Sequence, residues 1–256
     1  VIRRLARELA AAPTAAVYGR MGTTTVPFGT LTSWLIDVVN VLTGNLDSPG
    51  GVMFPLAPHA RRDTGPGGRG FVFGRWATRV RGLGEVMGEL PVAALAEEID
   101  TPGEGRLRAL VTIAGNPVLS TPNSARLAAA LDSLDFMVSV DPYLNETTRH
   151  ADVILPPTEA TRVGHYDFSL LGLAVRNFAA YSPPVLPPDP GGMDEFDILA
   201  RLAGIAAGQG PETDLAAFGE VMVDTAVRQA VADPASTVHG RDADELRAMV
   251  TGDTTA

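Results

Sequence analysis

The sequence predicts an α/β fold, in which a Rossmann-like parallel sheet is flanked by helices and preceded by a smaller N-terminal βα unit. Three short apolar segments, residues 107–114, 136–140 and 153–155, have the length and composition of buried strands. A helical segment at 124–133 separates the first two, as in a β-loop-α-β unit. Gly115-Asn116-Pro117 and Asp141 follow the first two strands and mark turns.

The N-terminal part, residues 1–51, reads as the end of one α/β subdomain. Residues 1–12 predict an amphipathic helix, and 14–18 predict a short strand. A glycine-marked loop at 19–25 leads into a second helix at 29–42, and glycine and proline end this unit at 44–51. We expect the apolar positions of the second helix to be buried, namely Trp34, Leu35, Val38, Val39 and Leu42.

Residues 52–90 are rich in glycine, proline and arginine, and predict an irregular linker. Residues 91–206 form the expected Rossmann-like subdomain. It begins with a short helix at 91–99 and ends with a helix whose first turn, from Asp194, is acidic. Residues 207–256 predict a helical tail, whose last residues, 251–256, are expected to fray.

Composition narrows the possible functions. The formal net charge of −10 disfavours nucleic acids and anionic membranes as partners. The absence of cysteine excludes disulfides, thiolate metal sites and iron–sulfur clusters within this chain. No apolar run is long enough to span a bilayer and no signal peptide is visible, so we expect a cytoplasmic protein. Since residue 1 is Val, we expect a processed chain or a piece of a longer one.

The loops after the strands are candidate ligand sites, because ligands of open parallel sheets bind at the carboxyl ends of the strands. Gly115 allows a turn, Asn116 opens the loop, Pro117 stiffens it, and Ser120 can donate a hydrogen bond. Asp141 can accept hydrogen bonds from ribose or guanine. The alternatives are structural: Ser120, Thr121 or Asn123 caps the next helix, and Asp141 is a turn residue before Pro142.

Other catalytic chemistries find no support. The four histidines, His59, His150, His165 and His239, lack metal-ligand spacing. The sequence has no nucleophile elbow, no Walker A loop and no G-x-G-x-x-G after a strand. No catalytic residue and no metal ligand are therefore expected.

The ordered motifs of residues 107–156 resemble the molybdopterin oxidoreductases that carry a bis-guanine-dinucleotide cofactor, such as formate dehydrogenases, nitrate reductases and dimethyl sulfoxide reductases. The resemblance rests on five short motifs at matching spacing: Gly115-Asn116-Pro117 with Ser120 and Pro122; Leu134-Asp135-Phe136; Asp141; Glu146-Thr147; and Ala151-Asp152 through Leu155-Pro156. Leu42-Thr43-Gly44-Asn45 and Pro49-Gly50-Gly51 extend it to the N-terminal region.

This resemblance implies a cofactor-binding segment that holds the guanosine diphosphate part of molybdopterin guanine dinucleotide. The implied contacts are Met21, Gly22, Thr25, Gly115, Asn116, Pro117, Ser120 and Asp141. The three threonines at 23–25 could equally form a plain loop, and Asp135 and Asp152 are expected to be structural. The molybdenum would be held by parts outside this chain, so the partner is the remainder of a parent enzyme or another subunit, and the chain alone would be inactive.

Two other functions stay open. The first is a stand-alone scaffold or regulatory subunit that keeps the fold without the cofactor. The second is an unrelated nucleotide-binding α/β domain. The region after residue 156 departs from the family pattern, at Glu159 and at Asp189-Pro190-Gly191-Gly192.

Overall fold

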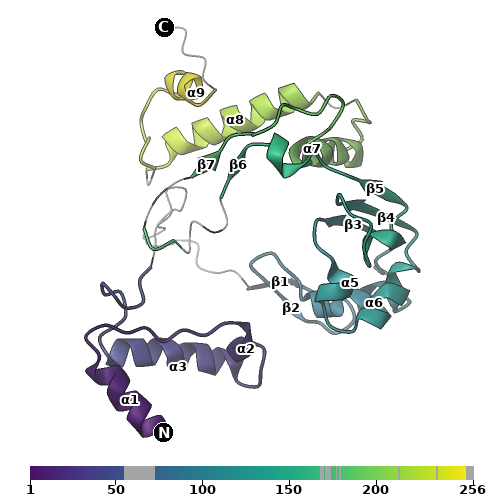
Figure 1. Cartoon of the computed structure of the whole chain (residues 1–256). Coiled ribbons are helices and arrows are strands. Elements are labelled where there is room, and N and C mark those ends of the chain that lie inside the picture. The colour runs from purple at the N-terminus through teal and green to yellow at the C-terminus, as the bar shows by residue number, and fades with distance from the viewer. Residues whose placement is uncertain are drawn as a thin grey trace. The chain divides into compact units, whose positions relative to one another are not determined.

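The computed structural model describes residues 1–54, 73–167, 170, 174–176, 178, 180–212, 214–234 and 236–251. The chain divides into two compact units (Figure 1). Unit 1 comprises residues 1–60 and 167–180, and unit 2 comprises residues 61–166 and 181–256. Each unit is described by itself.

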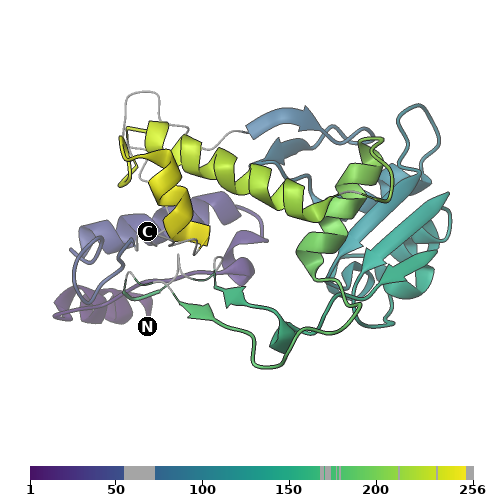
Figure 2. The ribbon, with the colours of Figure 1, turned by 90° about the horizontal axis from the view of Figure 1, so that it is seen from above.

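Unit 2 is built on a three-stranded parallel sheet in the order β3-β4-β5 (Figure 2). The strands are β3 (Ala109–Ile113), β4 (Phe136–Val140) and β5 (Val153–Leu155). Ile113 is in register with Val140, and Val140 with Leu155, so the carboxyl ends of all three strands lie at one edge. The predicted α/β class is confirmed, and the predicted strands at 136–140 and 153–155 have the predicted bounds.

Helices pack on this sheet through one apolar cluster. They are α4 (Leu95–Asp100), α5 (Pro117–Ser120) and α6 (Ser124–Leu131). Figure 1 labels α5 and α6 beside the sheet. Ile99, Val118, Leu127, Leu131 and Met137 are buried together. Burial of a side chain of this size stabilises a fold by about 1.5–3 kcal/mol, so this cluster holds the loop after β3 against the sheet.

Residues 73–86 form an antiparallel hairpin, where the sequence predicted an irregular linker. Its strands are β1 (Phe73–Ala77) and β2 (Gly84–Val86). The predicted linker also includes residues 55–72, which lie outside the described part. Arg81 pairs with Glu97 of α4, and Arg79 lies 3.7 Å from Glu98. These ion pairs between the hairpin and α4 explain why a hairpin forms where the sequence predicted a linker. A local pattern of glycine and proline does not reveal such pairs.

Acid is expected to destabilise the hairpin through Glu85. Arg75 hydrogen-bonds this buried carboxylate and lowers its pKa from about 4.5 to about 2. A lowered folded-state pKa contributes stability above pH 4.5 that is lost as the pH falls towards 2. The protection factor of the Gly88 amide, which donates to Glu85, should therefore fall as the pH is lowered across this window in the wild type. Glu85→Gln should flatten that dependence, and an equally steep profile in this variant would contradict the assignment.

Unit 1 contains α1 (Ile2–Ala11), α2 (Met21–Thr24) and α3 (Gly29–Leu42). The predicted helices at 1–12 and 29–42 are confirmed. The predicted strand at 14–18 is wrong: the segment forms no strand pairing among the described residues. Asn40 instead accepts from the Val17 N–H at 2.9 Å and donates to the Val17 carbonyl at 2.9 Å. Side-chain amides thus take the place of a neighbouring strand.

The expected burial of α3 is also wrong in part. Trp34, Leu35 and Leu42 are exposed at 59%, 46% and 80%, whereas the polar Asn40 is buried. Burial requires a partner surface, and within unit 1 the side of α3 that carries Asn40 is covered instead.

The remaining elements of unit 2 complete the chain. They are η1 (Val92–Ala94), η2 (Thr148–His150), η3 (Ala160–Arg162), β6 (His165–Tyr166), β7 (Tyr181–Ser182), α7 (Glu195–Ala206), α8 (Leu215–Ala232) and α9 (Ala243–Thr251). Asp194 caps α7 by accepting from the Asp197 N–H at 2.8 Å, as the acidic first turn predicts. The predicted helical tail is confirmed at α8 and α9, and its last residues, 252–256, lie outside the described part.

Candidate functional site

The parallel register brings three loops to one edge of the sheet. These loops follow Ile113, Val140 and Leu155. The first contains Gly115 and Asn116, and the second begins at Asp141. This edge is the place where open α/β sheets bind ligands, so the sequence-predicted residues of unit 2 gather at the expected site.

The backbone at the end of β3 is arranged unusually. Ala114 and Gly115 both have positive φ, at 51° and 74°. A left-handed conformation costs a non-glycine residue roughly 1–2 kcal/mol. The Ala114 N–H bonds to the Val140 carbonyl at 2.8 Å, which ties the turn to β4. In the described part of the chain, the N–H groups of Gly115 and Asn116 have no protein acceptor. They are therefore available to an anion.

Asn116, Pro117 and Ser120 lie in the tight turn that follows. Pro117 begins α5, and Ser120 Oγ donates to the Asn116 carbonyl at 3.0 Å. Thr121 donates to the Pro117 carbonyl, and Asn123 makes no side-chain capping bond to α6. The alternative interpretation of these residues as side-chain caps of the next helix is therefore wrong. The role of Ser120 as a ligand contact stays a prediction, with its proton already engaged within the loop.

Glu146 and Thr147, which follow β4, contact Asn116 directly. Asn116 Nδ2 donates to Glu146 Oε2 at 2.5 Å, and Thr147 Oγ1 donates to Asn116 Oδ1 at 2.7 Å. The bond from Asn116 lowers the pKa of the Glu146 carboxyl. The sequence shows the spacing of Glu146 and Thr147 but not their role, because residues 30 and 31 positions away from Asn116 give no local sign of contact.

Asp141 is buried and its carboxylate is engaged in its own turn. Oδ1 accepts from the Tyr143 N–H at 2.7 Å, and Oδ2 accepts from Asn145 Nδ2 at 3.3 Å. The turn role that the sequence left open is therefore present. Asp152 is structural as expected, since it accepts from the Met137 N–H at 2.7 Å.

Met21, Gly22 and Thr25 lie in unit 1, on or just after the single turn of α2. This turn is helical, where the sequence predicted a loop. Thr25 Oγ1 donates to the Met21 carbonyl at 2.7 Å, and Met21 and Gly22 are exposed. Their role as cofactor contacts stays a prediction.

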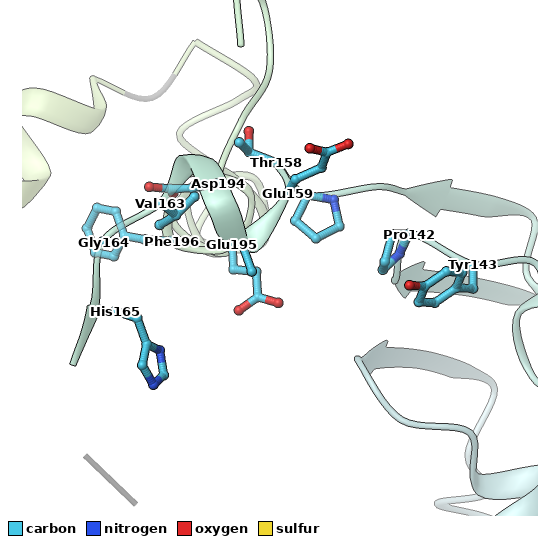
Figure 3. A pocket seen from close by; sticks show the side chains of 12 residues that line it. Pro142, Tyr143, Thr158, Glu159, Val163, Gly164, His165, Asp194, Glu195 and Phe196 are labelled. Atoms are coloured by element: carbon cyan, nitrogen blue, oxygen red, sulfur yellow. The ribbon is translucent and has the colours of Figure 1, made fainter. Parts of the chain in front are cut away.

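A cavity of about 590 Å³ adjoins the carboxyl edge within unit 2. Pro142 and Tyr143, from the loop after β4, line it together with the loop after β5 and the start of α7. Figure 3 shows the Glu195 side chain pointing into the open space between His165 and Tyr143. Glu159, Asp194 and Glu195 make this wall acidic, and Arg162 lies 3.6 Å from Glu159. The cavity therefore favours a ligand that presents hydrogen-bond donors over one that presents bare anionic oxygens.

The described residues contain no cluster of three or more histidine, aspartate or glutamate side chains that could hold a metal ion. They also contain no helix long and apolar enough to cross a membrane.

Replacing Gly115 with alanine is expected to cost about 1 kcal/mol of stability, since its φ is +74° and only backbone strain opposes a Cβ there. Gly219, within helix α8, is a matched control: it also has open space around a Cβ, and alanine there should gain about 0.5–1 kcal/mol. Urea unfolding of both variants measures the difference. A Gly115→Ala protein as stable as Gly219→Ala would show that the loop does not need its left-handed conformation.

The fold and this edge place the protein in the class of α/β proteins with a parallel sheet and turn-forming residues at its carboxyl edge. The family model for molybdopterin oxidoreductases matches residues 4–161, more than half of the chain. The chain therefore belongs to the molybdopterin oxidoreductase family.

Two curated proteins are similar over shorter stretches. The assimilatory nitrate reductase catalytic subunit of Bacillus subtilis is 36% identical over 70 residues, 27% of this chain and 10% of that protein. The F420-dependent formate dehydrogenase subunit alpha of Methanocaldococcus jannaschii is 40% identical over 62 residues, 24% of this chain and 9% of that protein. The matched region thus spans about a tenth of each relative.

Proposed function

We propose that this chain is a cofactor-binding segment of a molybdopterin-dependent oxidoreductase, and that its sheet edge holds the guanosine diphosphate part of molybdopterin guanine dinucleotide. The observation that carries the proposal is the pair of open N–H groups at Gly115 and Asn116, in a family whose cofactor is molybdopterin. Backbone amides in such a turn suit a diphosphate.

The acidic cavity supports a division of the ligand between two parts of the edge. Glu159, Asp194 and Glu195 line the cavity with three carboxylates, whereas the loop after β3 has one beside it, Glu146, which already accepts from Asn116 Nδ2. Phosphate is therefore repelled more strongly in the cavity, and the diphosphate belongs at the loop after β3. Guanine presents N–H donors at N1 and N2, which carboxylates accept well. The base or its ribose therefore belongs in the cavity beside Tyr143 and Glu195.

The redox chemistry belongs to the complete enzyme. When bound, the molybdenum of such a cofactor supplies two-electron oxidation or reduction. This chain contributes binding and orientation, and the metal ligand and the substrate pocket come from the remainder of the parent enzyme or a partner subunit. The chain alone is expected to be inactive.

Calorimetric titration of the 256-residue chain with guanosine diphosphate and adenosine diphosphate tests the proposal. We expect binding with a preference for guanosine diphosphate. Gly115→Ala should weaken it, whereas Gly219→Ala should not. Equal affinity for both nucleotides would refute the assignment of the base to the cavity. A complete lack of binding would favour the cofactor-free scaffold.

A further inference from the structure

A directed chain of hydrogen bonds connects the buried core of unit 2 to the loop after β3. The Val118 N–H donates to Thr147 Oγ1 at 3.0 Å, and the Thr147 hydroxyl donates to Asn116 Oδ1 at 2.7 Å. Asn116 Nδ2 then donates to Glu146 Oε2 at 2.5 Å. A backbone N–H can only donate and a carboxylate can only accept, so both ends of the chain fix its direction.

Burial makes this arrangement rigid at one end. Thr147 is completely buried and Val118 is 5% exposed, within the apolar cluster. A buried hydroxyl or amide without a hydrogen-bond partner is destabilising, which disfavours any other orientation of the Asn116 amide. These hydrogen bonds therefore fix the conformation of a partly exposed loop by attaching it to the buried core.

Hydrogen bonds within the protein engage the carbonyl and the whole side-chain amide of Asn116. Its carbonyl accepts from the Leu119 and Ser120 N–H groups and from the Ser120 hydroxyl. Its side-chain oxygen is engaged by Thr147, and its side-chain nitrogen donates to Glu146. Among the described residues, only water remains as a partner for the backbone N–H groups of Gly115 and Asn116.

We infer that Asn116, Glu146 and Thr147 are positioning residues: they hold the loop after β3 so that the N–H groups of Gly115 and Asn116 face the ligand. The side chain of Asn116 then acts within the protein and does not supply the ligand contact that the sequence predicted. This inference rests on the proposed function of the loop. The ionised state of Glu146 supports it, because only the carboxylate accepts from Asn116 without competing donors.

Reversing the polarity of the hydrogen bond between Asn116 and Glu146 distinguishes a positioning role from a general effect on folding. Asn116→Asp should place two carboxylates face to face and break the bond to Glu146. The double variant Asn116→Asp/Glu146→Gln restores a donor–acceptor pair with opposite polarity, because glutamine donates where glutamate accepts. It also keeps the net charge of the wild type. Asn123→Asp is the control, since it adds the same charge at a side chain that makes no cap bond.

The experiment measures guanosine diphosphate affinity and amide hydrogen exchange in the full chain for these variants. We expect Asn116→Asp to weaken binding about tenfold and to speed exchange at Val118 and Leu119. The double variant should recover affinity to within about threefold, and Asn123→Asp should stay within twofold of wild type. An unrecovered double variant, or an unaffected Asn116→Asp, would overturn the inference.

The two readouts keep the inference separate from the proposed function. If the wild type binds no nucleotide, the proposed function fails, and exchange at Val118 still reports whether the three residues order the loop. If the wild type binds and exchange changes without any change in affinity, the proposed function stands and the positioning role is overturned.

Discussion

Replacing Asn40 with alanine should destabilise unit 1 by about 2–4 kcal/mol, because it removes three hydrogen bonds at a buried position. Asn40 is 1% exposed. Its Nδ2 donates to the Val17 and Ile36 carbonyls at 2.9 and 3.1 Å, and its Oδ1 accepts from the Val17 N–H at 2.9 Å. Alanine would leave the polar groups of Val17 without partners, and the extended segment 14–18 should detach from α3.

Hydrogen exchange of the Val17 amide is the direct measurement. It should lose most of its protection in the Asn40→Ala protein. Asp37→Ala is the matched control, since Asp37 is an exposed polar residue on the same helix and should change stability by less than about 0.5 kcal/mol. Unchanged protection at Val17 would show that other contacts hold the segment.

Replacing Thr147 with valine should destabilise unit 2 by about 2–3 kcal/mol. Valine has nearly the same shape but lacks the hydroxyl, so the Val118 N–H and Asn116 Oδ1 lose their common partner. Thr147 is fully buried, and water cannot readily replace the lost bonds. The loop after β3 should become mobile, and any affinity for guanosine diphosphate should fall with it.

Thr147→Ser provides the comparison, because it keeps the hydroxyl and removes only a methyl group, at a cost of about 1 kcal/mol. Urea unfolding of the wild type and both variants measures the stabilities. If valine destabilises the protein by no more than serine does, about 1 kcal/mol, the two hydrogen bonds of the Thr147 hydroxyl contribute little to stability. That result would also weaken the case for Thr147 as a positioning residue.

Local sequence predicted the bounds of two strands of the sheet and of one helix in unit 1. The strands at Phe136–Val140 and Val153–Leu155 and the helix at Gly29–Leu42 have the predicted bounds. Apolar runs, helical periodicity and glycine or proline at the ends are local signals, and each depends on residues that are neighbours in the chain. The order of family motifs likewise predicted the molybdopterin oxidoreductase family, which the family match confirms.

Contacts between distant residues decided the rest. Segment 14–18 has the composition of a strand, yet it pairs with the side chain of Asn40, 23 residues away from Val17. The hairpin at 73–86 is held to α4 by ion pairs such as Arg81 with Glu97, which no turn signal reveals. Whether Trp34 is buried depended on which surface covers α3, and periodicity does not supply that surface.

For the site, the sequence by itself determined which residues stand after the strands, because strand ends are marked locally by Gly115-Asn116 and by Asp141. Only the tertiary structure decided what these side chains do. In the folded chain the Asp141 carboxylate accepts a hydrogen bond from the Tyr143 N–H of its own loop. Glu146 and Thr147 lie against Asn116. The physical reason is that hydrogen-bond partners are chosen by proximity in the folded chain, and proximity between residues thirty positions apart arises only when the sheet register is formed.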